Sequence, residues 1–90
     1  MKKSTRSEIE EKIKQILISQ FEIKLSILVE ISSTTPLLGR GIGLDSIEAL
    51  ALVAAIEKEF DIEIGDGDLT LDLVKNIGVL AEYVLQKTRD

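Results

Sequence analysis

Apolar side chains recur every three or four residues along three stretches of the chain, which is the spacing that places them on one face of an α-helix. Lysine and glutamate occupy the opposite face of the first stretch, as in the run EEKIKQ. The pattern therefore predicts three amphipathic helices. They extend from about Ser7 to about Gln20, from Asp45 or Ser46 to about Phe60, and from near Lys75 or Asn76 towards the C-terminus.

Two of these helices carry a start signal. Ser7 is followed three residues later by Glu10, which matches a capping box, and Asp45 is followed in the same way by Glu48. In the second case we expect Asp45 to take the N-cap position and to accept a hydrogen bond from a free backbone N–H. Ser46 then becomes the first helical residue, with its hydroxyl directed to solvent.

The segments between the helices are less regular. Residues 21–31 are ambiguous, because apolar side chains alternate as in a strand while some of them also continue the helical spacing. A lone strand would lack a partner, so we favour a fraying helix end followed by a packed extended loop. Pro36 and the glycines around it predict a loop over residues 32–43, whose leucines and isoleucine indicate that it lies on the core. Residues 65–73 are expected to hold at most one short helix.

Length and composition bound the fold class. A chain of 90 residues is enough for one small domain, which we place at residues 1–90. With only two Phe, one Tyr and no Trp, the core must be built from aliphatic side chains, which favours helices packed on helices. Cysteine and histidine are both absent, so the chain can form neither a disulfide nor a Ser–His–Asp triad, and it lacks the commonest transition-metal ligand.

The charge balance disfavours some partners. The chain has 16 acidic against 11 basic residues, a net charge of −5, whereas nucleic-acid binding needs a basic excess on one face. No apolar stretch approaches the roughly 20 residues that a membrane-spanning helix needs, and no apolar signal-peptide core follows the N-terminal lysines. We therefore expect a cytoplasmic monomer whose acidic surface suits basic patches on its partners.

The stretch GLDSIEAL, residues 43–50, raises the question of chemistry. Ser46 cannot act as a nucleophile unaided, because the chain offers no imidazole base and no thiol in its place. One interpretation is that Ser46 is a substrate for another enzyme, since the positive end of a helix favours a phosphate ester. The other is an ordinary helix cap, and the short motif taken alone favours it.

The surroundings of Ser46 change that balance. The signature GLDSI, residues 43–47, resembles that of the acyl carrier protein family, whose members are phosphopantetheine-binding carrier domains. The runs TPLLGRGIGLDS, SIEALALVAAIEKEFDIEI and VKNIGVLAEYV are similar to the family's attachment loop, second helix and last helix. The resemblance covers about residues 28–86, which is most of the chain.

The resemblance implies an all-α fold, a four-helix bundle with a short third helix. It also implies a 4′-phosphopantetheine group on Ser46, whose terminal thiol carries acyl groups as thioesters, and a carrier that is not itself an enzyme. Asp45 would cap the second helix and help a phosphopantetheinyl transferase to dock, and Leu44 and Ile47 would form the recognition surface together with acidic residues of that helix. The acidic residues that acyl-loading and acyl-transferring biosynthetic enzymes would recognise are Glu48, Glu57 and Glu59.

Some features leave the cargo open. Ala51 and Lys58 stand where members in fatty-acid synthesis often have acidic residues, which reflects either neutral drift or a docking face altered for particular partners. Alternatives are an aminoacyl or peptidyl carrier, against which the net charge argues mildly, and a helical interaction module without a prosthetic group. Asp66, Asp68 and Asp72 start like an EF-hand loop, but the required glycine and the twelfth-position glutamate are missing, so we expect at most weak divalent binding by clustered carboxylates and no dedicated metal site.

Overall fold

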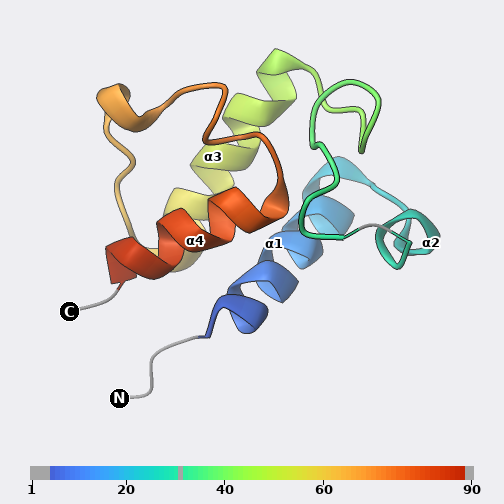
Figure 1. Cartoon of the computed structure of the whole chain (residues 1–90), viewed down its shortest axis with the longest axis horizontal. Helices are drawn as coiled ribbons and strands as arrows, with labels where there is room; N and C mark the ends of the chain where they lie inside the picture. The colour runs from blue at the N-terminus through green and yellow to red at the C-terminus, as the bar shows by residue number, and fades with distance from the viewer. Residues whose placement is uncertain (1–4, 31, 89–90) are drawn as a thin grey trace.

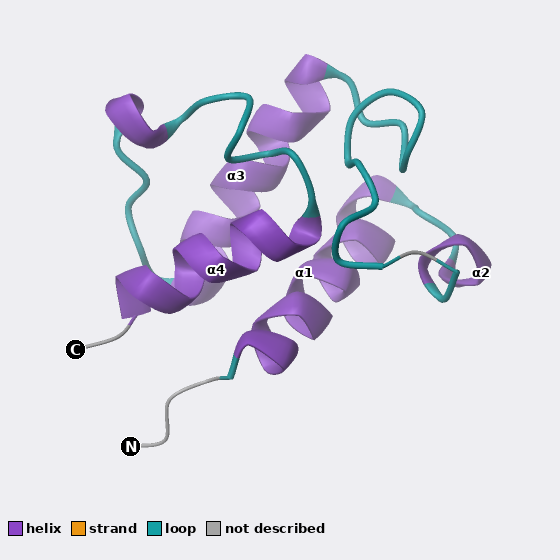
Figure 2. Cartoon of the chain, viewed as in Figure 1, coloured by secondary structure: helices purple, strands orange, loops and turns teal. Residues whose placement is uncertain are grey.

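The computed structural model describes residues 5–30 and 32–88, and its regular structure is helical (Figures 1 and 2). Two isolated backbone bridges are the only strand-like pairings in these residues. The predicted all-α fold is confirmed, and no helix of the described part is both long and apolar enough to cross a bilayer. The elements are α1 (Arg6–Phe21), α2 (Leu25–Leu28), α3 (Ser46–Phe60), the 3-10 turn η1 (Asp66–Asp68) and α4 (Ile77–Thr88).

Helix α1 begins earlier than predicted. Its capping box is formed by Thr5 and Glu8, not by Ser7 and Glu10: Glu8 N donates to Thr5 Oγ1 at 3.2 Å, and Thr5 N donates to Glu8 Oε1 at 2.8 Å. Both pairs fit the sequence pattern of a capping box. The earlier start places Arg6 inside the helix, where its guanidinium bonds to Glu10 and to a backbone carbonyl of α4. The register is therefore supported by a contact that is distant in sequence.

The prediction of an extended loop after α1 is wrong. Glu22 takes a left-handed conformation, with φ of 57°, that ends α1, and the chain re-enters a helix after the extended residue Lys24. Within the resulting α2, Leu28 is buried, whereas Leu25 is 61% exposed. One short turn is enough to bring Leu28 to the core, so the alternation of apolar residues here does not reflect burial. Ile31 lies outside the described residues.

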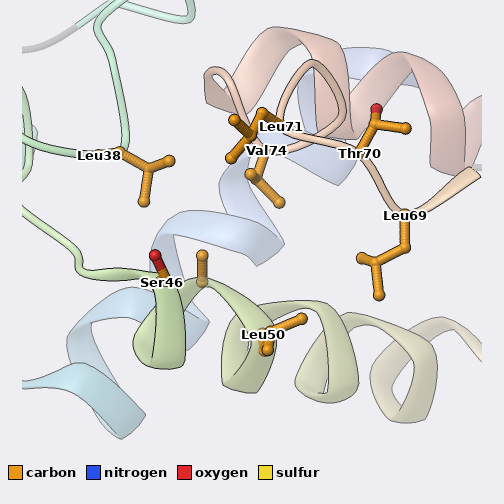
Figure 3. Close-up of a pocket in the computed structure, with 8 residues that line it drawn as sticks. Leu38, Ser46, Leu50, Leu69, Thr70, Leu71 and Val74 are labelled. Atoms are coloured by element: carbon orange, nitrogen blue, oxygen red, sulfur yellow. The ribbon is translucent and has the colours of Figure 1, made fainter.

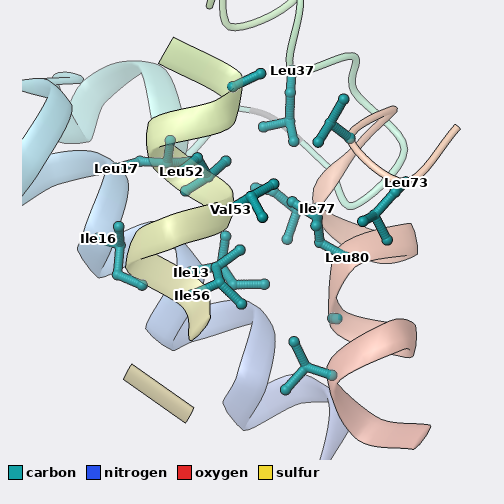
Figure 4. Packing of buried hydrophobic residues seen from close by; sticks show 14 of the residues in the cluster. Ile13, Ile16, Leu17, Leu37, Leu52, Val53, Ile56, Leu73, Ile77 and Leu80 are labelled. Atoms are coloured by element: carbon teal, nitrogen blue, oxygen red, sulfur yellow. The ribbon is translucent and has the colours of Figure 1, made fainter. Parts of the chain in front are cut away.

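The core lies where α1 packs against both α4 and α3 (Figure 4). All of its large side chains are aliphatic, as the composition predicts. The predicted periodic residues of the first and last helices are buried, which confirms the faces assigned to them. The buried apolar side chains of the long helices are Ile9, Ile13, Ile16 and Leu17 in α1, Ala49, Leu52, Val53 and Ile56 in α3, and Ile77, Leu80, Ala81 and Val84 in α4.

Helix α4 starts at the predicted place, against the loop that precedes α3. Asn76 caps it, because Asn76 Oδ1 accepts a hydrogen bond from Val79 N at 2.8 Å. Gly78 N donates to Ser33 O at 2.9 Å, and a Cβ at Gly78 would lie 3.1 Å from that oxygen and 2.9 Å from Arg6 Nη2. A side chain at this position would therefore crowd the Ser33 carbonyl and the end of the Arg6 side chain, which glycine avoids.

Candidate functional site

Ser46 is the first residue of α3, as the sequence predicts. Asp45 is the N-cap: Glu48 N donates to Asp45 Oδ1 at 2.7 Å, and Asp45 N donates to Glu48 Oε1 at 3.0 Å. Because Asp45 satisfies the capping bond, the hydroxyl of Ser46 takes no part in it, and the Ser46 side chain is exposed. The site thus presents an accessible hydroxyl at the positive end of a helix of 15 residues.

The loop before α3 fixes the position of Ser46. Leu44 N donates to Leu37 O at 2.9 Å, and both leucine side chains are buried, so the predicted packing of this loop on the core is confirmed. Gly41 has no room for a side chain, because a Cβ would overlap the carbonyl of Pro36. Leu44 is only 4% exposed, which differs from its expected place on the recognition surface. It anchors the loop from within.

A groove of about 240 Å³ opens beside Ser46 (Figure 3). Helix α3 forms one wall, and the segment between η1 and α4 forms the opposite wall. All of the lining residues except Ser46 and Thr70 are apolar, so the groove suits an apolar chain better than a charged ligand. The residues that line it are Leu38, Ser46, Ala49, Leu50, Leu69, Thr70, Leu71 and Val74.

Large apolar side chains are also exposed near Ser46. Ile47 is 78% exposed, Leu50 54% and Leu71 76%, although large apolar side chains are usually buried. Ile47 is therefore placed beside Ser46 at the surface, as expected. Contiguous exposed apolar side chains commonly mark surfaces that contact a partner.

The three glutamates expected to meet partner enzymes all have a partner within the chain. Glu48 belongs to the capping box of α3. Glu57 Oε2 accepts a hydrogen bond from Ile64 N at 2.8 Å and so supports the turn after α3. Glu59 Oε2 lies 3.6 Å from Lys12 Nζ, an exposed ion pair that contributes about 0–1 kcal/mol. The local fold thus uses part of the charge of α3.

Tyr83 and Asp68 form a contact that sequence reasoning missed. Tyr83 Oη, on α4, donates to Asp68 Oδ2, in η1, at 2.7 Å. Partial burial, followed by the hydrogen bond and the negative charge of Asp68, raises the pKa of Tyr83 to about 12. Lys87 Nζ lies 5.6 Å from the centre of the Tyr83 ring. No local pattern could have found this pair, because its residues belong to different elements.

The acidic residues near η1 do not form a metal site in the structure. Asp66, Asp68 and Asp72 are exposed, and within residues 5–30 and 32–88 no three acidic side chains are grouped so that they could hold a metal ion.

Comparison with known families decides the class of the site. Residues 11–84 match the family model described as the phosphopantetheine attachment site. The chain belongs to this family. It is therefore a carrier protein, and the prosthetic group of its family is a covalently attached 4′-phosphopantetheine. Carrier domains of this kind interact with the transferase that attaches the group and with biosynthetic enzymes, and they are not catalytic themselves.

The surroundings of Ser46 fit a phosphopantetheine group. Its phosphodiester carries a negative charge, which the N-terminus of α3 favours by about 0.3–1 kcal/mol. The exposed hydroxyl of Ser46 is free of the capping bond that Asp45 makes, so a bulky ester there breaks no contact that holds α3. The apolar groove begins directly beside this hydroxyl.

Proposed function

We propose that residues 1–90 act as one acyl carrier domain, which holds acyl intermediates as thioesters on a 4′-phosphopantetheine group attached to Ser46. The observation that carries the proposal is the apolar groove of about 240 Å³ that opens beside the exposed hydroxyl of Ser46. An acyl chain gains free energy by leaving water for such a groove, at about 0.8 kcal/mol for each buried methylene. Amino acids and peptides, which are polar, would gain less there.

The assignment of Ser46 is supported by a comparison with two of the other described serines, Ser32 and Ser19. Ser32 Oγ is engaged by Thr34 Oγ1 at 2.8 Å, and Ser19 Oγ lies 3.5 Å from the carbonyl of Ile16. Ser46 combines an exposed hydroxyl, a helix start and an adjacent groove. These features support Ser46 as the residue that the transferase modifies.

The chain's own residues would position the prosthetic group and shield its cargo. When bound, the group supplies a thiol that can hold an acyl group as a thioester. Asp45 holds the first turn of α3 in place, and buried Leu44 fixes the loop before it, so that Ser46 stays at one position. Ala49 leaves room beside Ser46, and Leu50 helps to exclude water from the groove. The proposed role is thus to hold and present, in fatty-acid, lipid or another acyl pathway.

The test of the attachment residue is a mass measurement. Wild type, Ser46→Ala and the control Ser26→Ala, which removes another exposed hydroxyl, are incubated with coenzyme A and a broad-specificity phosphopantetheinyl transferase. We expect wild type and Ser26→Ala to gain the mass of one phosphopantetheine group and Ser46→Ala to gain none. A mass gain in Ser46→Ala would refute the assignment. The absence of any gain in wild type would favour the interaction module without a prosthetic group.

Partner enzymes are proposed to contact the exposed face of α3 beside Ser46. Ile47 would supply apolar contact there, and Glu48 and Glu59 would add charge that their internal partners leave only partly free. Ile47→Ser should therefore raise the KM of the transferase for this carrier as its substrate more than Glu59→Gln does. With the wild-type carrier, this KM should rise only moderately as the salt concentration increases. The reverse order of the two variants would show that charge dominates recognition.

The departures from an acidic α3 can be tested on the same face. Ala51→Glu combined with Lys58→Glu restores the charge that carriers of fatty-acid synthesis often have, and both positions are exposed. We expect the double variant to react faster than wild type with a standard fatty-acid ketosynthase, because basic patches on the enzyme would attract it. Equal kinetics would mean that the two departures are neutral drift.

A further inference from the structure

The outer wall of the groove is weakly anchored. Residues 65–72, which run from the start of η1 to the last turn before α4, are all exposed, and buried apolar side chains flank them on both sides at Ile64 and Leu73. Leu69 and Leu71 of this segment line the groove, where they face Ser46 and Leu50 of α3 (Figure 3). The wall that would meet a cargo is therefore not part of the hydrophobic core.

Among the described residues, backbone hydrogen bonds attach this wall only to the residues that directly follow it: Leu73 N donates to Thr70 O at 3.1 Å, and Lys75 N donates to Asp72 O at 3.3 Å. The backbone amides of residues 65–72 donate hydrogen bonds to carbonyl oxygens of the same segment. Asp68 N donates to Gly65 O at 2.9 Å, and Leu69 N donates to Asp66 O at 3.3 Å. Of the hydrogen bonds found among the described residues, the one that joins residues 65–72 to another element is Tyr83 Oη to Asp68 Oδ2, at 2.7 Å.

The donor of this bond is well placed to hold the segment. Tyr83 lies on α4, which packs against α1, so the phenol is attached to the best-packed part of the molecule. The acceptor is a carboxylate, and hydrogen bonds to a charged group are stronger than those between neutral groups. With its pKa raised to about 12, the Tyr83 phenol stays protonated and able to donate at neutral pH.

We propose that the hydrogen bond between Tyr83 and Asp68 tethers the outer wall of the groove and thereby sets the length of acyl chain that the groove shelters. This inference rests on the proposed acyl carrier function. With the tether in place, Leu69 and Leu71 stay at a fixed distance from α3, and a chain longer than the groove has to leave part of itself in water. Without it, the wall can move away from α3 and admit a longer chain.

The first measurement concerns the tether alone and needs no cargo. Tyr83→Phe removes only the hydroxyl and keeps the ring beside Lys87, and Asp68→Asn removes the charged acceptor. Asp66→Asn is the matched control, since Asp66 lies in the same turn without a bond to α4. Hydrogen exchange of the backbone amides of residues 66–72 in the unloaded protein should speed up about tenfold in the first two variants and stay unchanged in the control. Unchanged exchange in Tyr83→Phe would overturn the proposal.

The second measurement concerns cargo length. Wild type and the three variants are loaded with hexanoyl, octanoyl, decanoyl or dodecanoyl thioesters, and the melting temperature of each is compared with that of its own holo form. In wild type and Asp66→Asn the rise should level off as the chain lengthens, whereas in Tyr83→Phe and Asp68→Asn it should continue to the longest chain. A structural role alone would shift all melting temperatures of a variant equally and leave this profile unchanged.

The two proposals fail differently. If wild type shows no rise with any chain, the acyl carrier function is contradicted, and the role of the tether in cargo length is lost with it. If wild type rises and levels off but Tyr83→Phe gives the same profile, only the tether is refuted, even where its hydrogen exchange is faster.

Discussion

We predict that an octanoyl chain on the carrier stabilises the protein beyond the effect of the prosthetic group alone. The groove beside Ser46 has a volume of about 240 Å³ and is lined mainly by leucine, valine and alanine. About six sheltered methylenes would contribute about 5 kcal/mol at about 0.8 kcal/mol each. Ordering the chain and widening the groove offset more than half of this, which leaves about 2 kcal/mol. For a domain of this size, that gain raises the melting temperature by about 8–16 °C.

The assay compares the thermal unfolding of the holo protein and of its octanoyl thioester, followed by circular dichroism at one pH and salt concentration. Ala49→Leu places a larger side chain in the groove and should abolish most of the rise. The matched control is Ala54→Leu, the same substitution on an exposed position of α3, which should preserve it. Taking the difference between loaded and holo protein within each variant removes the effect of the substitution on the unloaded fold.

Two results would refute this reasoning. Coincident unfolding of the holo and octanoyl forms of wild type would place the chain outside the protein and favour an aminoacyl or peptidyl carrier. Equal rises in Ala49→Leu and Ala54→Leu would show that the chain is sheltered, but away from the groove beside Ser46.

Three further predictions concern the fold around the site. Gly78→Ala should lower the free energy of unfolding in urea by about 1–3 kcal/mol, because its Cβ would be crowded, whereas Gly67→Ala, whose Cβ meets nothing within 4 Å, should change it by less than about 1 kcal/mol. Ultraviolet titration of Tyr83, the one tyrosine of the chain, should give a pKa of about 12 in wild type and a lower pKa in Asp68→Asn, and a pKa of 10.0 in folded wild type would contradict the contact. Because the pKa is higher in the folded than in the unfolded protein, the stability that the contact contributes is complete below pH 10.0 and is lost as the pH rises through about 12. Asp45→Ala should shift the urea midpoint by an amount equivalent to about 1 kcal/mol, and Asp45→Asn by less, because asparagine also caps; equal losses would mean that the charge, not the acceptor, matters.

The start of α3 could be predicted from the sequence because its determinants are local. Asp45 and Glu48 bond to each other across three residues, and the surrounding residues offer no competing pair. The buried faces of α1 and α4 were predictable for a similar reason, since apolar spacing reports burial directly when a helix has one face on the core. The exposed position of Ser46 follows from the same local bonds.

Other features depend on contacts between distant residues, which no local pattern encodes. Thr5 and Ser7 both begin a capping-box pattern, and the start of α1 is supported by Arg6, which reaches α4. The sequence suggests that Glu57 is an ordinary surface charge. In the fold, the left-handed residue Asp61 reverses the chain after α3, so that the backbone N–H of Ile64 donates a hydrogen bond to the Glu57 carboxylate. In each case the fold supplies a partner for a side chain to which the sequence assigns none.

The two sides of the groove differ in how firmly they are held, and this difference bears on function. On one side, the burial of Leu44 and the cap at Asp45 fix the backbone just before Ser46, and Ala49 in the core fixes it one turn later. The backbone at Ser46 is thereby held at one position. On the other side, residues 65–72 are exposed and are held by one side-chain bond to α4, by their own turns and by local bonds to the adjoining Leu73 and Lys75. Under the proposed acyl carrier function, this distribution of rigidity would keep the attachment residue Ser46 at a constant position while the groove accommodates acyl chains of different length.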